Sequence, residues 1–170
     1  MMSGLLMLLW AAAAPPAQRP DSAAAARVER AIKAASDSIG HLSGMTSAFR
    51  LDLQAASQTL VLERAARVQD GCAGAVAGLD SLLQVLGAGT VSPRAVAEQA
   101  ALGTAARDLR RTLVQCGREW NPHPPTATRA DSLRDWGPYR IQQLDVSLRR
   151  YDDARHAFQQ KAGLRKSTPQ

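Results

Sequence analysis

Apolar residues recur at spacings of three and four along most of this chain, and that spacing constrains its fold more than any other feature. Such a seam is typical of a helix that packs one face against other helices. One seam comprises Val28, Ile32, Ala35, Ile39, Leu42, Phe49, Leu53, Ala56 and Leu60. Few segments alternate with period two, alanine is abundant, and aromatic residues make up only 4% of the sequence. We therefore predict an all-α fold.

The boundary between the first two helices can be placed in two ways. Asp21 or Ser22 can cap the first helix. Gly40 and Gly44 favour a break near Gly44, which we expect, because glycine weakens a helix interior. The unbroken phase of the seam favours one long helix instead.

The second helical pattern begins near residue 46 and weakens at Asp70-Gly71. An apolar face then continues over residues 72–86. Gly74 and Gly78, four apart on this segment, would let another helix approach closely.

Glycine and proline mark two loops. Residues 87–93 read GAGTVSP, in which Ser92 is a candidate cap and Pro93 takes the first helical position. We expect the next helix to run to Trp120, where residues 121–125, NPHPP, end it.

The last helical region opens at Thr128 or Asp131 by the same criteria, and Gly137-Pro138 interrupts it. We expect a short helix to Trp136 and a longer one from Pro138. Short loops between long amphipathic helices predict an up-and-down antiparallel bundle of four helices, or five with the short one. The bundle domain covers residues 18–162, and residues 163–170 form a flexible polar tail.

The first 17 residues, MMSGLLMLLWAAAAPPA, have the pattern of a secretory signal peptide. The run Leu5–Ala14 is apolar throughout and ends in alanines, the small residues that precede a cleavage site. It is too short to cross a bilayer, which takes about 20 apolar residues. We expect cleavage after Ala17, a periplasmic or secreted location, and no transmembrane span in the mature protein.

Cys72 and Cys116 are the two cysteines, and in an oxidising compartment we expect them to form a disulfide. One geometric difficulty stands against the pair. In an ideal hairpin turning at residues 87–93, Cys116 lies eight residues further from the turn than Cys72, an offset of about 12 Å. The Cα atoms of a disulfide lie only about 5.5 Å apart. A redox role is less favoured, since the pair lacks the close spacing of a Cys-x-x-Cys site.

The positive charge is concentrated in the second half of the chain. The formal net charge is +6, and residues 107–170 supply all of the excess. The two interpretations are ordinary solvation of helix surfaces, with ion pairs such as Asp145–Arg149, or a basic patch that docks an anionic protein or membrane surface. Nucleic acid is not expected outside the cell. The candidate patch comprises Arg107, Arg110, Arg111, Arg118, Arg140, Arg149, Arg150 and Arg155.

Three aromatic residues, Trp120, Trp136 and Tyr139, cluster around the proline-rich loop. We expect them to close one end of the core. The alternative is an aromatic contact point at an interface.

No constellation for catalysis is visible. None of His41, His123 and His156 lies in a nucleophile–base signature, and the acidic residues lack metal-ligand spacing. We therefore expect no enzymatic activity, no metal site and no cofactor. The alternative is a haem, metal or apolar ligand in the bundle core, with His41, Met45 and His156 as candidate haem ligands.

The segment 150–161, RYDDARHAFQQK, resembles the final helix of the soluble b-type cytochrome bundles. The resemblance implies a four-helix bundle but not the cofactor. The histidine that binds iron in that family falls where this chain has Gln159, and the family's methionine near the mature N-terminus has no counterpart.

The sequence thus predicts an exported, non-catalytic helical bundle that acts through protein or membrane-surface contacts. An accessory subunit docked on the periplasmic face of a membrane complex would suit its basic second half. A bundle that carries a ligand in its core is the alternative.

Overall fold

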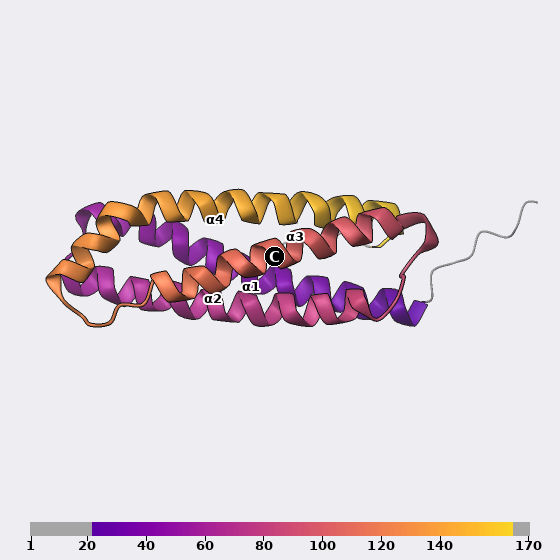
Figure 1. Cartoon of the computed structure of the whole chain (residues 1–170), viewed down its shortest axis with the longest axis horizontal. Helices are drawn as coiled ribbons and strands as arrows, with labels where there is room; N and C mark the ends of the chain where they lie inside the picture. The colour runs from indigo at the N-terminus through magenta and orange to yellow at the C-terminus, as the bar shows by residue number, and fades with distance from the viewer. Residues whose placement is uncertain (1–21, 165–170) are drawn as a thin grey trace, which may run out of the picture.

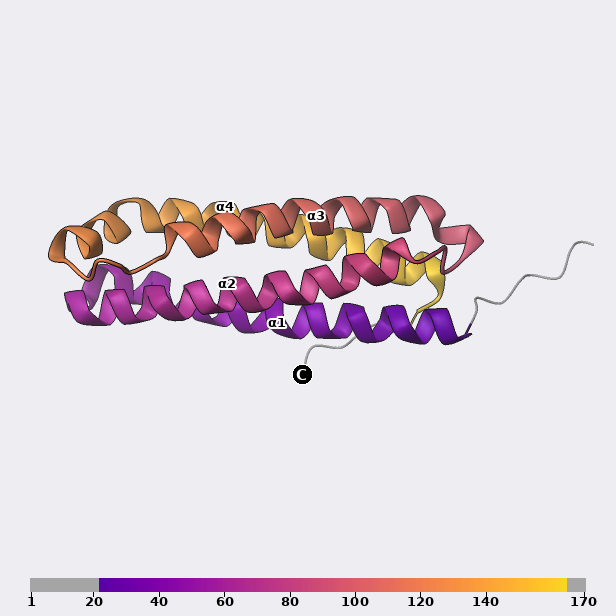
Figure 2. The ribbon, with the colours of Figure 1, turned by 60° about the horizontal axis from the view of Figure 1, so that its bottom comes forward.

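The computed structural model describes residues 22–164, which form four long antiparallel helices (Figures 1 and 2). They are α1 (Ser22–Ala55), α2 (Gln58–Gly87), α3 (Val96–Glu119) and α4 (Ala127–Ala162), and a short 3-10 helix, η1 (Pro93–Ala95), precedes α3. No strand occurs among these residues. The predicted all-α, up-and-down bundle is confirmed, with four α-helices. The expected signal peptide and residues 165–170 lie outside the described part.

The expected break near Gly44 is wrong. Helix α1 continues through both Gly40 and Gly44, and α2 likewise continues through Asp70-Gly71. Leu42, Phe49 and Leu53 stay on one fully buried face throughout, and that burial outweighs the cost of about 1 kcal/mol for each glycine. The chain turns instead at Ala56-Ser57, where the Ser57 hydroxyl accepts a hydrogen bond from the Leu60 N–H at 3.3 Å and caps α2.

The expected interruption at Gly137-Pro138 is also wrong. Helix α4 contains Pro138 in its interior, and its first turns are tilted against the rest (Figure 1). A proline there removes one backbone hydrogen bond and bends the helix without ending it. The cap is Thr126, whose hydroxyl accepts from the Arg129 N–H at 3.2 Å, and not Thr128 or Asp131.

The end of α4 is ordered beyond the expected boundary of the tail. Gly163 takes a left-handed conformation, with φ 69°, and its N–H bonds to the last turn of α4. Leu164, which the sequence places in the polar tail, is buried against the core.

The predicted loop after Gly87 is confirmed, and Pro93 opens η1 as expected. Ser92 makes no side-chain cap. Gln99 holds the loop instead: its amide donates to the carbonyls of Leu86 and Gly89 and its oxygen accepts from the Val91 N–H. One side chain of α3 therefore satisfies three backbone groups of the turn.

Glycine brings α1 and α2 close together. A Cβ on Gly78 would lie 3.1 Å from the Cα of Ala35, so the two backbones touch there. A Cβ on Gly74 would meet nothing within 4 Å, so only one of the two predicted glycines serves this contact. Gly71 serves a second one, since a Cβ there would overlap the Met45 side chain.

Candidate functional site

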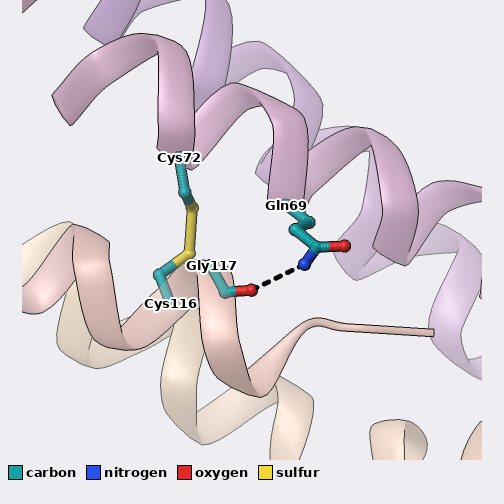
Figure 3. Close-up of a disulfide and its surroundings, with 4 residues drawn as sticks. All are labelled: Gln69, Cys72, Cys116 and Gly117. Carbon is teal, nitrogen blue, oxygen red and sulfur yellow. Dashed lines mark hydrogen bonds between the residues drawn. A yellow bond between two sulfur atoms is a disulfide. The ribbon is translucent and has the colours of Figure 1, made fainter. Parts of the chain in front are cut away.

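The predicted disulfide between Cys72 of α2 and Cys116 of α3 is present (Figure 3). The sulfur atoms are 2.08 Å apart and the Cα atoms 6.4 Å apart, and both cysteines are buried. Beside the disulfide, the Gln69 amide donates to the Gly117 carbonyl at 2.9 Å. The bond joins the middle of α2 to the last turn of α3 inside the core, where it has the position of a structural staple.

The offset that stood against this pair disappears because the hairpin is not ideal. Residues 88–95 extend past the end of α2 before the chain turns back (Figure 2). Helix α3 starts only at Val96, so part of the chain between the turn and Cys116 lies beyond the end of α2. Cys116 therefore reaches the same level along the bundle as Cys72.

Four of the eight candidate arginines are paired with another helix, buried, or on another side of the bundle. Arg110 pairs with Asp80 on α2, and Arg140 pairs with Glu119 on α3 at 2.9 Å. Arg155 is only 7% exposed and bonds to Asp152. Arg149 lines a groove on the opposite side of α4, against α1. The eight residues therefore do not form one patch.

The other four define an outer arginine face: Arg107, Arg111, Arg118 and Arg150. The first three are exposed and lie four and seven residues apart on one side of α3. The hydroxyls of Thr112 and Ser147 are 3.4 Å apart and fix the level of α4, which runs antiparallel beside α3. Arg150, one turn beyond Ser147, therefore lies beside the stretch of α3 that carries Arg107 and Arg111.

These four arginines have few carboxylate partners within the described part of the chain, so their positive charge can interact with another molecule. Arg118 and Arg150 pair with no carboxylate among residues 22–164. Arg107 donates only to the Thr104 hydroxyl. Arg111 pairs with Asp108, and both side chains are exposed to solvent. Such a surface ion pair contributes under about 1 kcal/mol.

The tryptophans close one end of the core. Trp120 is 2% exposed and packs edge-on against Phe49, with ring centroids 5.1 Å apart, and against Trp136 at 4.9 Å. A Cβ on Gly137 would lie 3.2 Å from the Trp120 ring, so this glycine makes room for it. Tyr139 differs, being 60% exposed, with its hydroxyl accepting from Gln143. Of the three aromatic candidates, Tyr139 alone presents its ring to the outside.

Two arginines that the sequence did not single out cap neighbouring helices. Arg134 donates to the Leu53 carbonyl at 3.1 Å and to the Ala56 carbonyl at 2.8 Å, at the end of α1. Arg129 donates to the Asn121 and Glu119 carbonyls at the end of α3 and lies over the Trp136 ring. Both satisfy carbonyls that a helix end leaves open. Their partners are remote in sequence or set by the loop, so no local pattern reveals them.

The candidate haem ligands are not brought together. His41 and Met45 line a hollow between α1 and α2, whereas His156 lies between α1 and α4, where its Nε2 is 3.2 Å from Asp152. His123 is exposed in the proline-rich loop. Within residues 22–164, no group of three or more His, Cys, Asp or Glu side chains is arranged to hold a metal ion.

A groove of about 410 Å³ runs between α1 and α4. We call it the α1–α4 groove and define it by Ser36, Ile39, Gly40, Leu148, Arg149 and Tyr151. Tyr151 is 2% exposed, and burial raises its pKa to about 12, although the charge of Arg155 and the Ser36 hydroxyl oppose that shift. The hydroxyls of Ser36 and Tyr151 are buried without a hydrogen bond of normal geometry among the described residues.

The expected Asp145–Arg149 pair does not form. Asp145 instead accepts from Arg50 of α1, with 2.6 Å between Nη2 and Oδ2. Arg149 is left without a carboxylate partner in the described part of the chain, at the edge of the groove.

Comparison with protein-family models, with curated proteins and with solved structures found no match to this chain. Among the helices over residues 22–164, none combines the length and the apolar character needed to cross a membrane.

Proposed function

We propose that this chain is an exported, non-catalytic four-helix bundle that docks through its outer arginine face onto an acidic surface of a partner protein. The observation that carries the proposal is the exposure of four arginines on one face of two neighbouring helices, two of them without any carboxylate partner among the described residues. Arginine favours this kind of contact, because its planar fork matches carboxylates in a bidentate geometry. A partner on the outer face of a membrane complex would fit the expected signal peptide.

The rest of the bundle supports a rigid docking module. The disulfide joins α2 to α3, the Trp120 cluster closes one end, and Gln99 fixes the turn at the other. A surface on long, fixed helices loses little conformational freedom when it binds. Rigid presentation of the four arginines would therefore favour a specific contact over loose attraction.

The proposal is tested by co-purification of the tagged, oxidised protein from the envelope fraction of its own organism. We expect a stoichiometric protein partner at low salt that is released as the salt concentration rises, because salt screens contacts between exposed charges. Reversal of Arg107, Arg111, Arg118 and Arg150 to Glu should abolish recovery of the partner.

The matched control reverses four exposed arginines elsewhere on the bundle, Arg27, Arg30, Arg67 and Arg94, and so changes the net charge equally. It should retain the partner. Equal loss of the partner in both variants would show that only the net charge matters. It would contradict the assignment of the outer arginine face as the docking surface. Salt-sensitive binding to phosphatidylglycerol vesicles, with no protein partner recovered, would contradict the protein-docking proposal in favour of a membrane surface.

Export is tested separately by N-terminal sequencing of the protein recovered from the periplasm or medium. We expect the mature chain to begin at Gln18. Recovery of the whole chain in the cytoplasm with Met1 still in place would contradict the signal peptide.

A further inference from the structure

The α1–α4 groove has the size and composition of a small-molecule site. Its volume of about 410 Å³ lies within the range of about 300–1,000 Å³ that ligand pockets occupy. Along α1 it extends from Lys33 to Ser43, which is about 15 Å at 1.5 Å per residue. An elongated ligand of moderate length fits such a shape better than a compact one.

Small side chains on α1 keep the groove open. Ser36, Gly40 and Ser43 follow one another at spacings of four and three, so they lie on the same side of the helix. A Cβ built on Gly40 would meet nothing within 4 Å, so the space beside it is empty of protein. Ile39 and Leu148, both partly buried, supply apolar walls from the two helices.

The groove also contains polar groups that the described residues leave unsatisfied. The Tyr151 hydroxyl belongs to a side chain that is 2% exposed, and it makes no hydrogen bond of normal geometry with residues 22–164. The Ser36 hydroxyl also makes no such bond, although it lies near enough to Tyr151 to lower the pKa of that phenol. Buried polar groups without partners are uncommon and destabilising, so a ligand that bonds to them would gain affinity.

The charges around the groove favour an anion. Its two carboxylates already have cationic partners: Asp37 binds Lys33 at 2.8 Å, and Asp152 binds Arg155. Arg149 is the cation at the groove that pairs with no carboxylate in the described part of the chain. An anionic head group would find its counter-charge at Arg149.

From these features we infer that the α1–α4 groove binds a small amphiphile with a single unbranched alkyl chain and a carboxylate head. The alkyl chain packs between Ile39 and Leu148 alongside Gly40. The carboxylate pairs with Arg149, and the hydroxyls of Ser36 and Tyr151 donate to its oxygens or to a water held beside them. The site lies on the opposite side of α4 from Arg150 and the outer arginine face, so it is independent of the proposed docking.

The test is calorimetric titration of the oxidised protein with decanoate, below the concentration at which decanoate forms micelles. We expect saturable binding of one molecule per chain. Decyltrimethylammonium has the same chain length with a cationic head, and it should bind at least tenfold more weakly. Equal affinity for the two probes would overturn the assignment of the head group, and the absence of saturable decanoate binding would overturn the site.

Two pairs of variants locate the binding. Gly40→Leu fills the groove from a position where an added Cβ meets nothing within 4 Å, and it should abolish binding. Gly44→Leu makes the same change one turn away at another open position and should bind as the wild type does. Arg149→Gln should weaken decanoate binding about tenfold, whereas Arg150→Gln should leave it unchanged. Thermal melts confirm folding, and decanoate binding that survives Gly40→Leu in a folded protein would contradict the inference.

Discussion

Helix α1 has one tight neighbour and one open one, and small residues are present at both interfaces. Toward α2, Gly78 and Ala35 bring the two backbones into contact, with only 3.1 Å between the Ala35 Cα and a Cβ placed on Gly78. Toward α4, Ser36 and Gly40 leave a groove of about 410 Å³. The same kind of residue thus closes one interface and opens the other.

The difference lies in the opposing helix and its connection. The turn at Ala56-Ser57 joins α1 directly to α2, and α2 presents Gly71 and Gly78. Helix α4 instead presents two large, buried side chains at this groove, Tyr151 and Arg155. Two helices can pack closely only where both carry small side chains at the same level along their axes.

The disulfide adds a covalent tie on the α2 side, and its loss should have the largest effect. The loop-entropy model gives about 4 kcal/mol of unfolding free energy for a bond between cysteines 44 residues apart. The double variant Cys72→Ala with Cys116→Ala should lower the stability by about that amount in urea unfolding. Wild-type protein unfolded under reducing conditions is the control and should match the variant. A loss below 1 kcal/mol would show that packing alone holds α2 and α3.

The tight interface should not accept a larger side chain. Gly78→Leu places atoms where the Ala35 backbone already lies, so it should cost about 3 kcal/mol through overpacking. Gly74→Leu, one turn away on the same helix, meets open space and should cost nothing, because leucine is the better helix former. Equal effects of the two substitutions in thermal unfolding would remove the distinction between the interfaces.

The groove between α1 and α4 contains Tyr151, whose ionisation can be followed by absorbance. Burial raises the pKa of Tyr151 to about 12 from its ordinary 10. The unfolded chain therefore releases this proton first, so the contribution to stability is complete below pH 10 and is lost as the pH rises toward 12. A spectrophotometric titration should show a tyrosinate step near pH 12, or at alkaline unfolding, that Tyr151→Phe lacks. A Tyr151 step near pH 10 in the folded protein, identified by its absence from Tyr151→Phe, would contradict the burial of this ring.

Tyr151→Phe also tests whether the groove leaves the hydroxyl unsatisfied. Removing a buried hydroxyl without a partner should raise the stability by about 1 kcal/mol at neutral pH. A decrease of that size in urea unfolding would mean that the hydroxyl has a partner in the folded protein.

The smallest effect is expected at Gly40. Gly40→Ala adds a methyl group that meets no protein atom, so the better helix propensity should raise the stability by about 0.5–1 kcal/mol. The same change at Gly78, where the Ala35 backbone is only 3.1 Å away, should lose that gain to crowding. A larger gain for Gly78→Ala than for Gly40→Ala would reverse the comparison.

Local sequence patterns predicted the buried face of the first helix, but they failed where a glycine or proline was expected to break a helix. The positions 42, 49 and 53 of the first seam are all fully buried, as its spacing predicts. Gly44 and Pro138 carry strong local signals for a break, yet both lie inside continuous helices. Each signal is worth about 1–3 kcal/mol, and the burial of a long apolar face outweighs it.

The candidate binding residues show the same limit more strongly. Three arginines within two turns of α4 have different surroundings. Arg149 lines the groove, Arg150 lies on the outer face, and Arg155 is buried. Asp145 could pair with Arg149 by spacing alone, and it pairs with Arg50 of α1 because that helix lies beside it. Sequence spacing gives the side of a helix but not its neighbour.

The sequence by itself therefore determined the all-α bundle, the residues that fill its core, the main loops and the cysteine pair, because each depends on periodicity or on chemistry within one segment. The tertiary structure decided which glycines bring helices together, which arginines stay exposed, and where a groove remains. Those outcomes depend on the level and tilt at which two helices meet, and these are set by side chains far apart in the chain.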